Sequence, residues 1–232
     1  MPVPDLQRFD VEGRSIAYRL RSGTSPTLVF LPGYASDMEG AKALALDAFA
    51  EARGLAMLRL DYSGTGSSGG RFEDGSLDRW MAEALQAIDQ LTTGPLIVIG
   101  SSMGGWLALH LALARPDRTR ALVGIAAAPD FTDWGFVDVQ AAETAGIAPS
   151  FWESGQRLRL LAGEIAIDCP VRLIHGEHDP DVPLEVALRT LAAIRSDDVQ
   201  LKVIKGGGHR LSEPHEIDAI VRTVAELLEP IR

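Results

Sequence analysis

Short, continuous apolar runs alternate along most of the chain with segments whose apolar residues recur at helical spacing. The runs are rich in Val, Ile and Leu, as expected of strands that are buried on both faces. They occupy residues 27–31, 55–60, 95–100, 121–126, 171–175 and 199–204. The helical segments lie at about 40–53, 77–91, 103–114, 183–194 and 217–228. This alternation predicts a doubly wound α/β architecture with a mostly parallel sheet and helices on both faces.

The start of the chain follows a different pattern. Residues 6–20 alternate loosely between apolar and polar side chains around Glu12-Gly13, which predicts an antiparallel hairpin. With the later runs, the hairpin brings the expected sheet to about eight strands. The length of 232 residues fits one domain, and no repeat or low-complexity tract divides it, so we expect a single domain over residues 1–232.

Residues 130–168 interrupt the alternation, because they contain several aromatic side chains but no strand pattern. We expect this segment to form a short lid or cap over the carboxyl edge of the sheet, where the sites of such folds lie. Its aromatic side chains either contact the substrate or anchor a helical excursion to the body, and both roles fit the pattern. They are Trp134, Phe136, Phe151 and Trp152.

A Gly-x-Ser-x-Gly pattern at residues 100–104 stands between an apolar run and a helical segment, and it predicts that Ser102 is a nucleophile. A tight turn from strand to helix lifts the middle side chain out of the sheet, and the helix amides point toward a developing oxyanion. The same pattern recurs at residues 66–70. No helical segment follows it, so we interpret Ser68 as a turn residue.

A serine nucleophile needs a base and an acid that orients the base. His209 follows the run 199–204 and three glycines, in a loop that can bring an imidazole over the sheet edge. Asp179 lies just after the run 171–175, so the order Ser102, Asp179, His209 is that of a Ser-Asp-His hydrolase. The competing acids are Glu177, Asp181 and Asp130, and the other histidines are His110, His175, His178 and His215.

The expected oxyanion hole consists of two backbone amides. One is the N–H of Met103, which follows the nucleophile, and the other comes from Pro32-Gly33-Tyr34 after the first apolar run. Tyr34 is the residue that we expect to donate it, and its side chain is a candidate substrate contact.

Composition and charge narrow the range of partners. The chain has 22 basic and 32 acidic residues, a net charge of −10, and no basic block, which argues against nucleic acid or an anionic membrane as a partner. The single Cys169 cannot form an internal disulfide. No run approaches the roughly 18 apolar residues of a membrane span, and residues 1–14 contain no signal-like apolar stretch. We therefore expect no membrane insertion and a cytoplasmic protein.

We expect no metal and no cofactor. The sequence has no His-x-x-x-His pair, and one cysteine cannot build a thiolate cluster. The loop at 64–66 follows an apolar run but leads into more loop, so it does not match a nucleotide-binding fingerprint. The acidic and histidine residues at 175–181 are explained more simply as a loop that carries the catalytic acid.

These motifs together resemble those of the serine α/β-hydrolases. They are Leu31-Pro32-Gly33-Tyr34, Asp61-Tyr62-Ser63-Gly64-Thr65-Gly66-Ser67-Ser68, Gly100-Ser101-Ser102-Met103-Gly104-Gly105-Trp106, His175-Gly176 with Asp179, and His209-Arg210. More narrowly, they resemble a branch of mitochondrial acyl-glucuronide esterases and palmitoyl-protein thioesterases. The resemblance implies an α/β-hydrolase fold, with Ser102 as nucleophile, Asp179 as acid and His209 as base. Compared with that branch, we expect a shorter 130–168 segment and no transit peptide before the first strand.

The expected activity is hydrolysis of a carboxylic ester or thioester through an acyl-enzyme, on a small-molecule or acylated-protein substrate. The alternatives on the same scaffold are a C–C hydrolase and an aminopeptidase. A different class is a small-molecule receptor that keeps the triad without turnover. Aromatic side chains near the expected site favour an apolar acyl group. The chain is expected to be a monomer or a homodimer.

Overall fold

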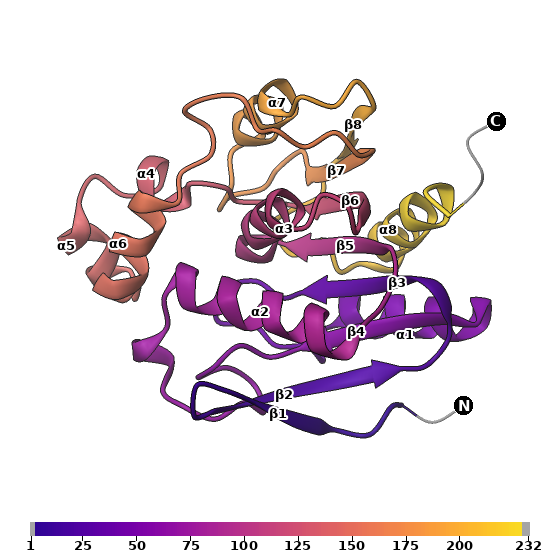
Figure 1. The fold of residues 1–232 in the computed structure, drawn as a ribbon. Coiled ribbons are helices and arrows are strands. Elements are labelled where there is room, and N and C mark those ends of the chain that lie inside the picture. Colours follow the sequence, from indigo (N-terminus) through magenta and orange to yellow (C-terminus); the bar gives the residue numbers. More distant parts are fainter. Residues whose placement is uncertain (1–2, 229–232) are drawn as a thin grey trace.

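An eight-stranded sheet forms the centre of the protein in a computed structural model, which describes residues 3–228 (Figure 1). Its strands follow the order β1-β2-β4-β3-β5-β6-β7-β8. They are β1 (Gln7–Val11), β2 (Arg14–Arg21), β3 (Thr24–Leu31), β4 (Leu55–Leu60), β5 (Leu96–Ser101), β6 (Thr119–Ile125), β7 (Val171–Gly176) and β8 (Val199–Ile204). The ends of the predicted single domain, residues 1–2 and 229–232, lie outside the described residues.

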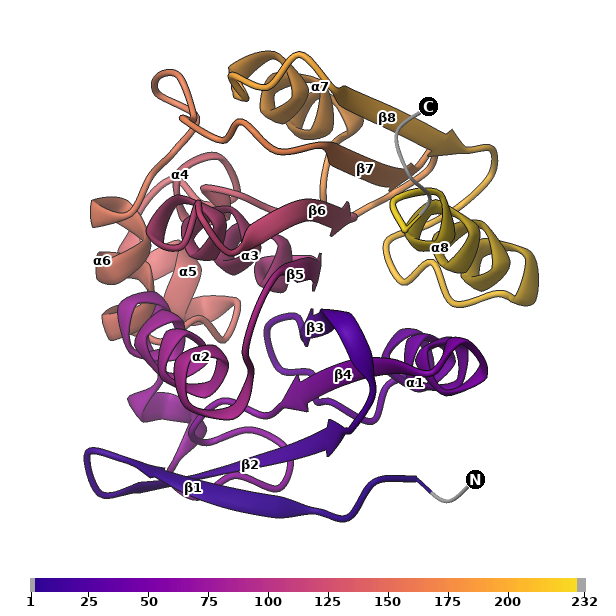
Figure 2. The ribbon, with the colours of Figure 1, turned by 45° about the vertical axis from the view of Figure 1, so that its right-hand side comes forward.

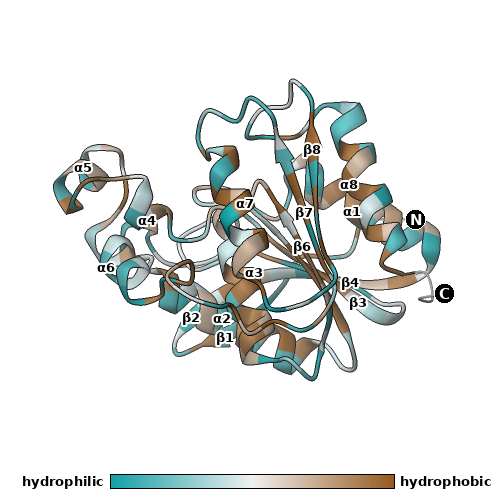
Figure 3. Ribbon diagram, turned by 90° about the horizontal axis from the view of Figure 1, so that it is seen from above, coloured by the Kyte–Doolittle hydropathy of each residue, from teal (hydrophilic) through white to brown (hydrophobic). Residues whose placement is uncertain are grey.

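Helices cover both faces of the sheet, as Figures 2 and 3 show from two directions. One face carries α1 (Ala41–Arg53) and α8 (Pro214–Glu226), which pack against each other. The other face carries α2 (Leu77–Leu91), α3 (Met103–Ala114) and α7 (Leu184–Ala193). Each face has its own apolar core, so the central strands are buried on both sides and carry apolar residues without alternation.

The pairing confirms the predicted fold class. β3 to β8 pair in parallel, whereas β1 pairs with β2, and β2 with β4, in antiparallel fashion. Glu12 and Gly13 have φ angles of 52° and 79°, as a two-residue hairpin turn requires. β3 begins at Thr24, three residues before the predicted run, and its pairing with β4 shifts register between Thr24 and Leu28. Pro26 lies in this stretch and has no N–H to donate to a ladder.

Residues 130–168 leave the sheet as an excursion of short helices, and no strand lies among them. The helices are α4 (Phe131–Trp134), α5 (Val139–Thr144) and α6 (Pro149–Arg157). They lie beyond the end toward which the arrows of β3 and β5 point in Figure 1, which is the carboxyl end of the parallel strands. We call this excursion the 130–168 segment.

Buried hydrogen bonds tie the two ends of the 130–168 segment together. The buried carboxylate of Asp130 accepts from the backbone N–H groups of Leu160 at 2.8 Å and Leu161 at 2.7 Å. At the same place, Leu158 O accepts from Trp106 Nε1 at 3.2 Å and lies 2.9 Å from His110 Nε2. α3 therefore holds the base of the segment through side chains that the sequence analysis assigned no catalytic role.

Replacing Asp130 with Asn tests this anchor. The introduced amide has one acceptor oxygen where two carboxylate oxygens now meet two N–H donors, so the free energy of unfolding should fall by about 1–3 kcal/mol. Asp133→Asn, which removes an exposed ion pair with Arg159 in the same segment, should cost less than about 0.5 kcal/mol. Urea denaturation of both variants measures the difference, and equal midpoints would contradict the anchoring role.

Candidate active site

The turn from β5 into α3 holds Ser102 in a strained backbone conformation. Its φ of 55° and ψ of −121° lie outside the regions that most residues adopt. Backbone hydrogen bonds fix it: its N–H donates to Ile125 O at 2.9 Å, and its carbonyl accepts from Gly105 N and Ala128 N. The neighbouring strand and the start of α3 together keep the hydroxyl at the carboxyl end of the sheet.

Two glycines make this turn possible. A Cβ on Gly100 would lie within 3.0 Å of the backbone of Gly104, and a Cβ on Gly104 would lie equally close to the backbone of Leu31 and Pro32. The glycines of the Gly-x-Ser-x-Gly pattern are therefore required by close backbone approach, independently of their flexibility.

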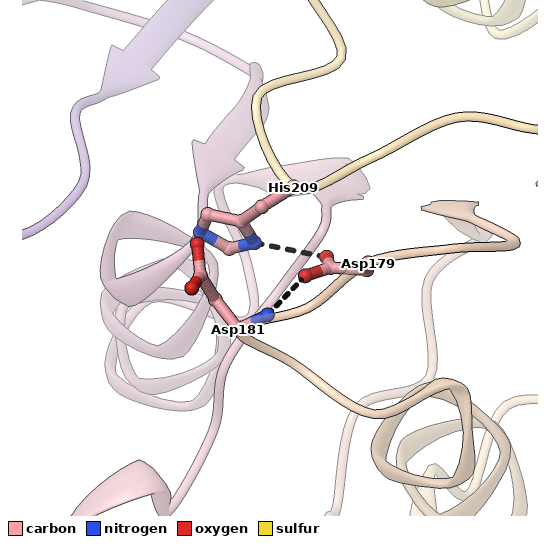
Figure 4. Close-up of side chains that lie close together, drawn as sticks. All are labelled: Asp179, Asp181 and His209. Carbon is pink, nitrogen blue, oxygen red and sulfur yellow. Dashed lines mark hydrogen bonds and ion pairs between the residues drawn. The ribbon is translucent and has the colours of Figure 1, made fainter.

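Ser102, His209 and Asp179 come together in one hydrogen-bonded chain. His209 Nε2 lies 3.0 Å from Ser102 Oγ. On the other side of the ring, His209 Nδ1 lies 2.9 Å from Asp179 Oδ2, the contact drawn in Figure 4. The Asp179 side chain is fully buried, whereas the imidazole of His209 is 20% exposed. The three predicted residues thus have the geometry in which an imidazole can take the proton of a serine hydroxyl.

Asp179 is held as an acceptor by the donors around it. Its Oδ1 accepts from the backbone N–H groups of Asp181 and Val182, both at 2.9 Å, and its Oδ2 faces His209. Burial by itself would raise the pKa of Asp179, but the hydrogen bonds from His209, Val182 and Asp181 outweigh it and hold the pKa below its usual value. The carboxylate therefore stays ionised at neutral pH beside the imidazole.

The loop that carries His209 packs closely against the loop that carries Asp179. His178 N donates to Gly207 O at 2.8 Å, and Gly206 N donates to Glu177 Oε2 at 2.9 Å. A Cβ on Gly176 would collide with Gly207, so the glycine at the end of β7 allows this approach. The glycine run before His209 thus serves as a packed connection between the ends of β7 and β8.

A second carboxylate lies beside the imidazole. The Asp181 side chain is exposed and rises next to the His209 ring in Figure 4. Asp179, Asp181 and His209 can each present one ligand atom within 4.8 Å of the others, which is a possible arrangement for a cation. Both oxygens of Asp179 already accept from N–H donors, however, so a cation would have to displace them. The hydrogen bonds from Ser102 through His209 to Asp179 need no such displacement of donors.

A cavity of about 460 Å³ opens onto Ser102 and His209. Its lining includes Gly33 and Tyr34 from the loop after β3, together with Lys42 and Arg210. The sequence analysis missed Lys42 and Arg210 in the cavity wall. The only signal for Lys42 was its place in the first turn of the helix that follows the Tyr34 loop.

The amides of Tyr34 and Met103, which are the predicted oxyanion donors, are both available to donate. Within residues 3–228, neither N–H donates to a protein acceptor. Met103 begins α3, so its N–H points out of the helix start. Gly33 lies directly against Ser102, where an added Cβ would be 3.3 Å from the Ser102 Cβ, which brings the Tyr34 loop close to the nucleophile.

The aromatic side chains of the 130–168 segment do not line this cavity. Phe151 is buried, with its ring centroid 4.9 Å from that of Tyr34 and 5.4 Å from that of Trp80. Phe136 and Trp152 pack against the same core, and Trp134 Nε1 donates to Pro129 O at 2.7 Å. Of the two roles that fit the sequence, the contacts match the anchoring of a helical excursion, and substrate contact by these four side chains stays a prediction.

The competing residues have structural partners. Ser68 Oγ donates to Asp61 O at 2.7 Å and accepts from Ala17 N at 2.8 Å, so it joins a loop to β2 as a turn residue. His175 Nε2 lies 2.9 Å from Val182 O. Burial raises the pKa of the Cys169 thiol to about 11, which keeps it protonated.

The fold and this site define an α/β-hydrolase, and comparison with known proteins agrees. A family model described as serine aminopeptidase S33 matches residues 24–138. The human palmitoyl-protein thioesterase ABHD10, mitochondrial, is 35% identical over 94% of this chain and 78% of its own length. The solved structure of mouse α/β-hydrolase domain-containing protein 10 superposes with a TM-score of 0.90 at 34% identity, over 97% of this chain and 98% of its own. A putative hydrolase from Agrobacterium vitis S4 has a TM-score of 0.90 at 35% identity, over 99% and 100%.

The chain belongs to the ABHD10 family of α/β-hydrolases. It is a hydrolase of ester or thioester bonds, as expected from the resemblance. The expectation of a cytoplasmic protein is wrong, because the ABHD10 relatives from five mammals are all named mitochondrial. Neither the composition nor the lack of a signal-like apolar stretch distinguishes a cytoplasmic from a mitochondrial protein. Among the described residues, no helix has the length and apolar character needed to cross a membrane.

Gly100→Ala tests the close packing of the turn. The added methyl group would collide with the Gly104 backbone, so the free energy of unfolding should fall by about 2–4 kcal/mol and hydrolysis should be lost. Gly163→Ala is the control, since nothing lies within 4 Å of its Cβ position, and it should change stability by less than about 0.5 kcal/mol. Wild-type stability and activity in Gly100→Ala would show that the turn tolerates a side chain there.

Asp179→Asn tests the buried acid, with Asp181→Asn as its exposed neighbour. Removing the charge that orients His209 should lower kcat about 10⁴-fold, the size seen when the acid of a serine triad is replaced in this way, whereas Asp181→Asn should lower it less than about 10-fold. Ester hydrolysis measured side by side decides between the two acids. A larger loss in Asp181→Asn would assign the orienting role to Asp181.

The lowered pKa of Asp179 should also make the free energy of unfolding depend on pH. A carboxyl group whose pKa is depressed on folding stabilises the protein above its unfolded-state pKa, about 3.8 for an aspartate, and this contribution is lost as the pH falls through the folded pKa. The stability difference between the wild type and Asp179→Asn should thus be larger at about pH 5 than below about pH 4. Urea midpoints across this range measure it, and a difference that grows toward acid pH would contradict the assignment.

Proposed function

We propose that this protein hydrolyses acyl thioesters and esters through an acyl-enzyme on Ser102, with fatty-acylated proteins as a substrate class. The observation that carries the proposal is the chain of hydrogen bonds from Ser102 Oγ through His209 to the buried Asp179, at 3.0 and 2.9 Å. It occurs at a strained strand-to-helix turn whose glycines are required by packing. A strained strand-to-helix turn that presents a serine to a hydrogen-bonded His-Asp pair is characteristic of serine hydrolases.

The acylation step follows from this geometry. His209 Nε2 takes the proton of Ser102 Oγ as the oxygen attacks the acyl carbon, and the carbonyl electrons move onto the oxygen. The N–H groups of Met103 and Tyr34 donate to that oxyanion, and each such donor contributes roughly 10²–10³ in rate. When the tetrahedral intermediate collapses, the bond to the leaving sulfur or oxygen breaks, and His209 gives its proton to the departing group.

Deacylation repeats the same steps with water. His209 removes a proton from a water molecule, whose oxygen attacks the acyl-serine. The same two amides hold the second oxyanion, and the proton returns from His209 to Ser102 Oγ as the carboxylic acid leaves. Throughout, Asp179 keeps the Nδ1 proton on the imidazole and stabilises the imidazolium when it forms.

The activity for which the relatives are named supports an acyl-protein thioester as substrate, since palmitoyl-protein thioesterases match this chain over most of its length. Ser102 also lines a cavity together with the exposed Arg210, which leaves room for a large leaving group such as a protein cysteine to approach from solvent. The partners of the enzyme are then acylated proteins and small acyl esters.

Ser102→Ala tests the proposal directly, with Ser68→Ala as the matched control from the second copy of the pattern. Ser102→Ala should lower kcat for p-nitrophenyl esters and S-acyl peptides by roughly 10⁴–10⁶ while the unfolding midpoint stays the same. Ser68→Ala should keep kcat within about threefold but lose about 1 kcal/mol of stability, because two hydrogen bonds disappear. Near-wild-type turnover by Ser102→Ala would refute the mechanism.

A further inference from the structure

A second cavity lies on the far side of Tyr34 from the nucleophile. It has a volume of about 290 Å³ and lies between the loop at Phe72 and the turn from α5 to α6. Its apolar wall consists of Phe72, Ile147, Ala148 and Pro149, and two exposed carboxylates, Glu73 and Glu143, stand at its rim. Nothing in the triad mechanism uses this cavity.

Tyr34 separates this second cavity from the cavity of Ser102. Among the residues described in the structure, Tyr34 alone lines both. Its ring lies 5.0 Å from Phe72 and 4.9 Å from Phe151, measured between ring centroids, so it stands as a wall between the two spaces. A movement of this one side chain would join them.

The ring of Tyr34 is packed among four aromatic side chains, whereas its hydroxyl is held only by long hydrogen bonds. Its hydroxyl donates to Gly146 O at 3.2 Å and accepts from Ala148 N at 3.4 Å, both at the long end of the hydrogen-bond range. Burial raises the pKa of this hydroxyl, so it remains protonated and able to donate at neutral pH. The two partners belong to the turn from α5 to α6, which links the position of the ring to the 130–168 segment. Each bond of this kind contributes little net stability and is easily exchanged.

The chemistry of the two cavities differs. The Ser102 cavity is lined by the charged Lys42, Arg210 and Asp37 together with apolar atoms, which suits a polar leaving group and a short acyl chain. The lining of the second cavity is mostly apolar. A long acyl chain attached to Ser102 therefore buries more of its methylene groups if it reaches the second cavity.

We propose that the Tyr34 side chain rotates away from its position between the two cavities. The cavity at Phe72, Ile147, Ala148 and Pro149 then receives the distal part of a long acyl chain. This inference rests on the proposed function, because it concerns the acyl group that Ser102 carries. A short acyl group is accommodated without movement of Tyr34, whereas a long one exchanges two long hydrogen bonds and part of the aromatic packing of Tyr34 for buried methylene contacts. Tyr34 is thus a specificity-determining residue for chain length, and its hydroxyl latch couples chain length to the 130–168 segment.

Three variants test the wall. Tyr34→Phe keeps the ring but removes the latch, Tyr34→Ala joins the two cavities permanently, and Ala148→Phe fills the second cavity from its far side. The readout is the ratio of second-order inactivation rates by hexadecyl and butyl fluorophosphonates, which react with the serine alone. The ratio should rise on the order of 3- to 10-fold in the two Tyr34 variants and fall on the order of 10-fold in Ala148→Phe. Leu188→Phe, on the exposed face of α7 and away from both cavities, should leave it unchanged.

Ratios that stay within about twofold of wild type in all three variants would overturn the inference while leaving the proposed function intact, since the serine still reacts. If no phosphonate reacts with Ser102 in the wild-type chain, the proposed function itself fails. A crystal structure of the hexadecyl phosphonate adduct adds a direct view. The tail is expected between Tyr34 and Ile147, and a tail that runs past Lys42 or Arg210 would contradict the assignment.

Discussion

The site depends on the close backbone approach at the turn between β5 and α3. Gly100 and Gly104 let strand, helix and the loop after β3 meet at distances that a Cβ would forbid. This contact holds Ser102 in its strained conformation, sets the Met103 N–H at the helix start and brings Gly33 and Tyr34 next to the nucleophile. Backbone packing thus positions the proposed nucleophile and the expected oxyanion donors together.

The other half of the site is built by hydrogen bonds between loops. Asp179 is buried, yet its polar contacts keep it ionised, because the N–H groups of Asp181 and Val182 and the imidazole of His209 all point at its two oxygens. The glycines before His209 fit against the end of β7 and fix the distance between base and acid. Asp130 holds the 130–168 segment in a similar way, because its buried carboxylate accepts hydrogen bonds from the backbone N–H groups of Leu160 and Leu161. Buried acids with several backbone donors therefore define both the catalytic geometry and the position of the segment beside it.

Much of the fold could be predicted from the sequence, because parallel strands that are buried on both faces leave continuous apolar runs. The bounds of β4 and β8 match their runs, and the hairpin turn at Glu12-Gly13 has the expected positive φ angles. The positions of Ser102, Asp179 and His209 at the ends of separate strands were also readable, since each follows a run. The excursion at residues 130–168 was expected, but its short helices were not, because they are stabilised by contacts distant in sequence, such as Asp130 with Leu161 and Phe151 with Trp80. Lys42 and Arg210 in the Ser102 cavity, and Tyr34 between the two cavities, were also not predictable, because residues distant in sequence form these cavities.

We propose that one strained serine, Ser102, out of two that match the same pattern, carries the reactive oxygen. A fluorophosphonate probe followed by peptide mapping and fragmentation mass spectrometry tests it most directly. We expect one adduct per chain, located on Ser102. The adduct should be lost when His209 is replaced by Gln, because the serine is then no longer deprotonated. An adduct on Ser68 or Ser101, or continued ester hydrolysis by a chain that takes up no probe, would contradict it.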